Sequence, residues 1–88
     1  MKIHENFLLR EVAGTPVVMP VGDAAERFNG MIKLNDTATY LWRQMTEDTT
    51  EEALLDAMMR DYDIDRDTAL SDIRNFVNTL RAAGILDE

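Results

Sequence analysis

The fold is decided by Phe28-Asn29-Gly30-Met31-Ile32-Lys33-Leu34-Asn35-Asp36-Thr37-Ala38-Thr39-Tyr40-Leu41-Trp42. The first part of this stretch has the composition of a short strand that ends at Leu34. From Ala38 onward the apolar residues recur at helical spacing instead, and Asn35 or Asp36 can cap the start of a helix. The strand therefore passes into the helix with almost no loop, and the helix fixes its position. A strand held in this way can offer its free edge to another chain.

Two further strands are expected before this stretch. Ala13-Gly14 permits a tight turn between two apolar runs, which predicts a hairpin. Residues 22–27 then form a polar connection to the third strand. The predicted strands span residues 6–13, 16–21 and 29–34.

Residues in the third strand alternate between two faces. Ile32 and Leu34 share one face, while Met31 and Lys33 share the other. If the first pair belongs to the core, Met31 is free to adapt to the side chains of a bound chain.

Three helices are expected in the rest of the chain. The first carries Trp42 on its apolar stripe, Thr49 with Glu52 forms a capping-box pattern for the second, and Asp65 can cap the third. Gly84 suits the left-handed turn that ends a helix, after which residues 85 and 86 fold back as a hydrophobic clasp. The predicted helices span residues 36–46, 50–62 and 66–83.

Together these elements predict an α+β, winged-helix-like fold, with three short N-terminal β-strands followed by three α-helices. No linker or repeat divides the chain, so residues 1–88 are expected to form a single domain. Trp42 is expected in its core, and Met45, Met58 and Met59 are expected to fill the core rather than to hold a cofactor.

Size and charge restrict the function. The chain has 88 residues, 9 of them basic and 17 acidic, which gives a formal net charge of -8 and disfavours phosphate backbones and anionic lipid. It has no cysteine and no apolar run of membrane-spanning length, and its start lacks the apolar stretch of a signal peptide. We therefore expect a cytoplasmic protein that binds neither nucleic acid nor membrane.

Catalytic and metal chemistry finds little support in the residues. His4 is the only histidine and is expected in a frayed terminus. The aspartates at positions 61, 63, 65, 67 and 72 have the spacing of a calcium loop, but Arg66 stands where that loop needs glycine. The chain also lacks a glycine-rich phosphate loop, a Ser–His–Asp set and a Cys–His pair. We expect no enzyme activity, no metal and no cofactor.

The third helix has an apolar arc about 140° wide when residues are placed at 100° intervals, which is broader than one packing seam requires. Phe76 is the large residue on one flank, beside Asp72 and Thr79. It is the candidate for a side chain that meets a bound peptide. Packing of Phe76 into the core alone is the alternative.

Several segments of the chain, in this order and spacing, resemble a known family, that of coenzyme PQQ synthesis protein D. The segments that carry the resemblance are Phe28-Asn29-Gly30-Met31-Ile32-Lys33-Leu34-Asn35 with Leu41-Trp42, Thr49-Thr50-Glu51-Glu52-Ala53-Leu54, Tyr62-Asp63-Ile64-Asp65, Asp72-Ile73-Arg74-Asn75-Phe76-Val77-Asn78-Thr79-Leu80 and Ala83-Gly84-Ile85-Leu86. They cover nearly the whole chain.

The resemblance implies a non-enzymatic peptide chaperone, the recognition element of a ribosomal peptide-modifying system. Such a protein binds the leader of a precursor peptide as an added strand and presents it to a modifying enzyme, which in PQQ biosynthesis is a radical S-adenosylmethionine (radical SAM) protein. Carried over to this chain, the peptide lies along the third strand and against the third helix. The implied peptide-binding residues are Gly30, Met31, Ile32, Lys33, Leu34, Asp72, Asn75, Phe76 and Thr79.

Two other functions stay open. A structural or dimerisation module could pair its open strand with a second copy, forming a homodimer. A winged helix can also read DNA through its third helix. In residues 65–82, however, three arginines are balanced by three aspartates, so the helix lacks a positive footprint.

Overall fold

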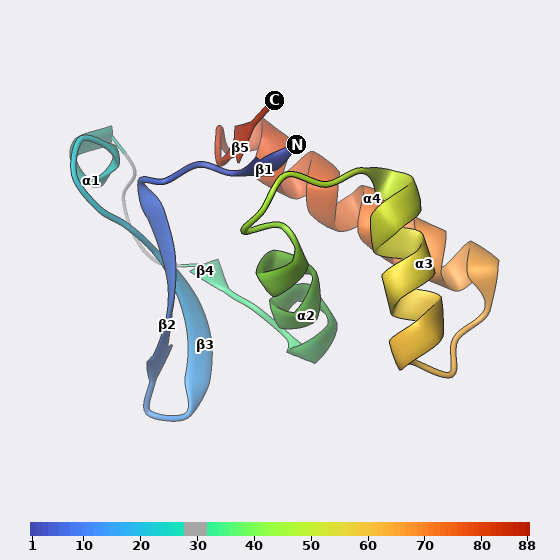
Figure 1. Ribbon diagram of the computed structural model, residues 1–88. Helices are drawn as coiled ribbons and strands as arrows, with labels where there is room; N and C mark the ends of the chain where they lie inside the picture. The colour runs from blue at the N-terminus through green and yellow to red at the C-terminus, as the bar shows by residue number, and fades with distance from the viewer. Residues whose placement is uncertain (28–31) are drawn as a thin grey trace.

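The computed structural model describes residues 1–27 and 32–88. It places β-strands in the N-terminal part of the chain and the three long helices after them, which confirms the α+β prediction (Figure 1). In chain order the elements are β1 (Lys2–Ile3), β2 (Phe7–Val12), β3 (Thr15–Pro20), α1 (Ala24–Arg27), β4 (Ile32–Lys33), α2 (Asp36–Gln44), α3 (Glu51–Asp61), α4 (Arg66–Ala82) and β5 (Leu86–Asp87).

Strands β2 and β3 form the predicted hairpin. Ala13 and Gly14 have φ angles of 52° and 81°, the left-handed values that a two-residue hairpin turn of type I′ requires at both central positions. β3 also pairs antiparallel with β4, so the strand order is β2-β3-β4. The predicted third strand is thus an edge strand of this sheet. Of its predicted span, residues 29–31 lie outside the described part of the chain.

The chain termini meet in a small second sheet, and the prediction of a frayed start around His4 is wrong. β1 pairs with β5, Ile3 opposite Leu86. The Ile3 amide donates to the Met45 carbonyl (2.8 Å), and the His4 amide donates to that of Ile85 (2.7 Å). Ile85 is fully buried, so the hydrophobic clasp predicted for the end of the chain forms and holds its beginning as well.

The polar connection expected over residues 22–27 is also corrected, because its last four residues fold into the short helix α1. Ala24 is buried in the core cluster of the molecule. The remaining residues of α1 are exposed, which is why their composition resembled that of a loop.

Side-chain caps begin the three long helices. Asn35 Oδ1 accepts from the Ala38 amide (2.8 Å) at α2, and Asp65 Oδ1 accepts from the Thr68 amide (2.7 Å) at α4. At α3 the cap is Thr50, whose Oγ1 accepts from the Ala53 amide (3.1 Å). The capping-box prediction at Thr49 was therefore wrong by one residue.

The core lies between the sheet and helices α2, α3 and α4. Trp42 is 2% exposed, and Met45 and Met58 are buried with it, as predicted. Met59 is 41% exposed, so its assignment to the core was wrong. None of the helices in residues 1–27 and 32–88 is long and apolar enough to cross a membrane.

Candidate functional site

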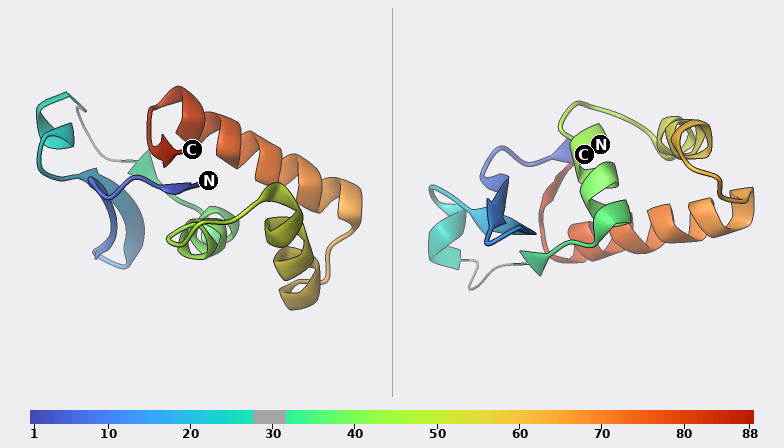
Figure 2. Two further views of the ribbon diagram at one scale, coloured as in Figure 1. Left: turned by 45° about the horizontal axis from the view of Figure 1, so that its top comes forward. Right: turned by 90° about the horizontal axis from the view of Figure 1, so that it is seen from below.

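Strand β4 presents one backbone edge to β3 and the other away from it. The Leu34 amide donates to the Pro16 carbonyl (3.1 Å), and Lys33 lies opposite Val17 in the register. Because backbone groups of an antiparallel strand alternate between its two sides, the N–H and C=O of Lys33 point away from β3. They are the groups that an added strand would bind. In both views of Figure 2, β4 lies between β3 and α4.

The side chains of this strand alternate as the sequence predicts. Leu34 is buried and Ile32 packs against the core cluster, while Lys33 is exposed. Gly30 and Met31, the other two predicted binding residues of the strand, lie outside the described residues.

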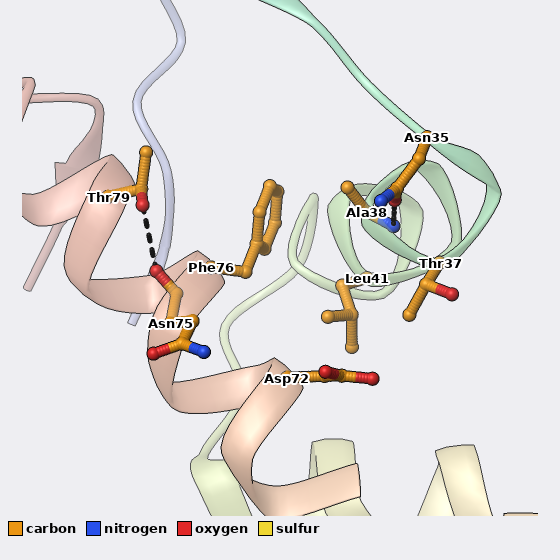
Figure 3. Close-up of a pocket in the computed structure, with 8 residues that line it drawn as sticks. All are labelled: Asn35, Thr37, Ala38, Leu41, Asp72, Asn75, Phe76 and Thr79. Carbon is orange, nitrogen blue, oxygen red and sulfur yellow. Dashed lines mark hydrogen bonds between the residues drawn. The ribbon is translucent and has the colours of Figure 1, made fainter. Parts of the chain in front are cut away.

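The four binding residues predicted on α4 meet in one cleft of about 280 Å³ between α4 and α2 (Figure 3). Its α4 wall consists of Asp72, Asn75, Phe76 and Thr79, and its α2 wall consists of Asn35, Thr37, Ala38 and Leu41. Asn35 directly follows the residue that ends the β4 pairing. The cleft therefore begins where the edge strand stops.

Phe76 points from α4 into this cleft (Figure 3). Its side chain is half-buried and packs against the edge of the core, whereas Ile73, Val77 and Leu80 on the same helix are buried. The wide apolar arc of α4 therefore does leave one flank outside the closed core. An aromatic face that is half covered can bury more surface when an apolar side chain joins it.

Some polar side chains of the cleft wall are hydrogen-bonded within the protein, and others remain available to a ligand. Thr79 Oγ1 donates to the Asn75 carbonyl of its own helix (2.8 Å), and Asn35 Oδ1 is occupied by its cap (Figure 3). Within the described part of the chain, no hydrogen bond or ion pair engages the Asp72 carboxylate or the Asn75 side-chain amide. These groups can receive polar groups of a ligand, and Asp72 favours a cation.

Sequence reasoning missed the α2 wall of the cleft. Ala38 and Leu41 lie on the apolar stripe of α2, so they were assigned to the core, and Asn35 was read only as a cap. Helical period shows which residues share a face but not which helix stands opposite. The signal that was present is Asn35 itself, since a cap directly after a strand brings the first turn of its helix beside that strand.

Two of the aspartates that resembled a calcium loop have other partners. The Asp61 carboxylate accepts from Tyr40 and from Arg60, and Asp65 caps α4. In residues 1–27 and 32–88, no three His, Asp or Glu side chains are grouped to hold a metal ion.

One protein-family model matches most of the chain. The family model of coenzyme PQQ synthesis protein D matches residues 10–86. The chain belongs to this family. A search of curated proteins gives no significant match.

Among solved structures, the PqqD-family chain is similar to TbiB1, whose structure was determined in complex with the TbiA(beta) leader peptide. The TM-score is 0.78 at 22% sequence identity, over 99% of this chain and 95% of TbiB1. At that identity the likeness shows that the fold is shared.

Proposed function

We propose that the chain is a non-enzymatic peptide chaperone. It binds the leader of a ribosomally made precursor peptide by strand addition to β4 and presents that peptide to a modifying enzyme. The observation that carries the proposal is the cleft beside β4, which joins an outward-facing backbone edge to an aromatic side chain on α4. Family membership and the leader peptide bound by TbiB1 support it.

The two parts of the site have separate roles in this proposal. The N–H and C=O of Lys33 bind the main chain of the peptide and so tolerate many sequences. Phe76 accepts an apolar side chain of the peptide in the cleft, and Asp72 is the only charged group among the described residues that line it. A leader with an apolar residue next to a lysine or arginine fits this arrangement best. We infer a radical SAM enzyme as the partner that receives the peptide, as in PQQ biosynthesis.

DNA binding has weaker support. Two of the three arginines of α4 are bound to acids, Arg74 to Glu51 (3.0 Å) and Arg81 to Glu88 (2.7 Å). A helix whose cations are neutralised in this way has little affinity for phosphates.

Calorimetric titration with the leader segment of a candidate precursor peptide from the same genome tests the proposal. Phe76→Ala should weaken peptide binding about tenfold or more, as expected for an aromatic anchor in a binding site. Leu70→Ala is the matched control, because Leu70 is also a half-buried apolar residue of α4 but does not line the cleft. The proposal fails if the unaltered chain does not bind the leader, or if both variants bind it equally well.

A further inference from the structure

Strand β2 is the second edge of the sheet, and no strand of the described part of the chain lies on its outward side. The hairpin that it forms with β3 projects from the rest of the molecule (Figure 1). Val12 and Thr15 flank the two-residue turn and form a hydrogen-bonded pair, from which the bonding alternates along the strand. The N–H and C=O of Leu9 and Glu11 therefore point away from β3. Pro16, which has no N–H and lies opposite Glu11, agrees with this assignment.

A groove runs beside this edge on the helical side of the sheet. It consists of two adjoining cavities of about 310 Å³ and 300 Å³, which share Leu9 and Arg43. The first also reaches Phe7 and Trp42, and the second reaches Glu11. Arg43 is exposed, and its side chain makes no hydrogen bond or ion pair within the described residues. The groove thus holds a cation that can bind an acidic side chain of an added strand.

We propose that the edge of β2 binds a second copy of the chain, with the two β2 strands antiparallel and Leu9 at the two-fold axis. The Leu9 residues of the two copies then exchange N–H···O bonds, and Glu11 of each copy lies opposite Phe7 of the other. Phe7 lines the same cavity as Arg43, so Glu11 of the second copy meets the cation of the groove. Symmetry forms this contact twice. The acidic residue of that cavity, Glu5, precedes β2 and has no residue opposite it in the paired strands.

The charge pattern of β2 selects this register among the symmetric ones. A pairing centred on Arg10 or on Glu11 would place two like charges directly opposite each other, which is destabilising. A pairing centred on Leu8 would need the Phe7 amide, which already donates to the His4 carbonyl (3.2 Å). A strand that pairs with its own copy without such conflicts favours the second copy as the occupant of this edge.

Two exposed apolar side chains also become covered in this pairing. Leu8 is 40% exposed and Val12 is 47% exposed, and both lie on the face of β2 opposite to the groove. Leu8 of one copy lies diagonal to Leu8 and Val12 of the other, within reach of long side chains. The net charge of -8 on each copy opposes association, so the dimer is a weak one. The edge of β4 stays free in it, because β3 separates β4 from β2.

Exchange of the charges at Glu11 and Arg43 tests the proposal, by sedimentation equilibrium at physiological salt over a range of chain concentrations. The unaltered chain should show a monomer–dimer equilibrium. Glu11→Lys and Arg43→Glu should each weaken the dimer about tenfold or more, since each brings like charges together at both symmetric contacts. The double variant restores opposite charges and should regain the dimer. Glu47→Lys and Arg66→Glu are the matched controls, because they make the same charge changes at exposed residues outside the groove.

A proline substitution tests the strand pairing independently of charge. Glu11→Pro removes an N–H that β3 does not use and blocks the edge with its ring, so this variant should stay folded but remain monomeric. In the unaltered chain, hydrogen exchange of the Leu9 amide should slow as the chain concentration rises. The Arg10 amide, which is bonded to β3, should not change.

The results separate this interface from other ones. An unaltered chain that stays monomeric at every concentration would overturn the inference, as would a dimer that the double variant fails to restore. A dimer that survives in a folded Glu11→Pro variant would also overturn it. Protection of the Lys33 amide instead of the Leu9 amide would place the second copy on β4 and would contradict the proposal equally. If the proline variant unfolds, the charge exchange and the Leu9 amide decide the outcome. None of these measurements uses a leader peptide, so the proposed function is tested separately.

Discussion

The Tyr40 hydroxyl donates a hydrogen bond of 2.5 Å to a carboxylate oxygen of Asp61 and so ties α2 to the end of α3. Tyr40 also meets the ring of Tyr62 edge-on, with centroids 5.0 Å apart. Partial burial and the bond to Asp61 together raise the pKa of Tyr40 to about 12. The pKa of Asp61 is lowered, first by its bond with Arg60 and then by that with Tyr40. Both shifts favour the pair as it stands at neutral pH, a neutral phenol beside an ionised carboxylate.

The first prediction concerns the alkaline stability of the chain. A tyrosine in an unfolded chain ionises near pH 10. Because the folded pKa of Tyr40 is higher, about 12, its contribution is complete below pH 10 and is lost as the pH rises toward 12. Tyr40→Phe should therefore unfold at a lower temperature than the parent at neutral pH, and this difference should shrink as the pH rises through that window. A difference that stays constant up to pH 12 would contradict the assignment.

The second prediction concerns Trp42, which is 2% exposed in the core. Trp42→Ala should lower the free energy of unfolding by roughly 3–5 kcal/mol, the usual loss for a buried aromatic truncation. Met59→Ala is the control on α3, since Met59 is 41% exposed, and it should change that free energy by no more than about 0.5 kcal/mol. Urea unfolding followed by circular dichroism measures both. A stable Trp42→Ala variant that loses peptide binding would make Trp42 a ligand platform instead of a core residue.

The third prediction separates two adjacent threonines. Thr50 Oγ1 caps α3 through the Ala53 amide, while Thr49 takes part in bonds to Met1 through its backbone. Thr50→Ala should destabilise the chain by about 1 kcal/mol, the typical loss of an N-cap. Thr49→Ala keeps its backbone bonds and should leave the free energy of unfolding unchanged. Equal losses in the two variants would show that the cap is shared or misplaced.

These threonines also show where sequence reasoning reaches its limit. Helical period and cap chemistry found the three long helices, because both are local properties of a few consecutive residues. They missed the β1–β5 pair, since strands of two residues such as Lys2–Ile3 have no period, and their pairing depends on residues at the opposite end of the chain. They also missed α1, whose only buried residue is Ala24.

The candidate site also contains residues that the sequence identifies and residues that it does not. The period of α4 identified Phe76 and its neighbours, because a surplus of apolar residues on one face is visible in the sequence itself. The residues opposite them, such as Asn35 and Ala38, depend on how α2 crosses α4, which no local pattern records. Which residues contact a peptide stays a prediction.

The last prediction tests how the peptide is held, through single backbone amides. The Leu34 amide already donates to Pro16, whereas the Lys33 amide faces the free edge of β4. Adding the leader peptide should therefore slow hydrogen exchange strongly at Lys33, while the Leu34 amide, protected by its bond within the sheet, should change much less. Nuclear magnetic resonance resolves the two amides in one experiment.

A peptide could also add to the opposite edge of the same sheet. That edge is β2, which is longer than β4. Protection of alternate amides in Phe7–Val12, with Lys33 unchanged, would place the peptide on that edge. Protection confined to α3 would exclude strand addition altogether, even for a peptide that binds. Protection of the Lys33 amide reports on the edge of β4, and weaker binding of the Phe76→Ala variant reports on the cleft. Both results together are needed to show that the edge and the cleft form one peptide-binding site.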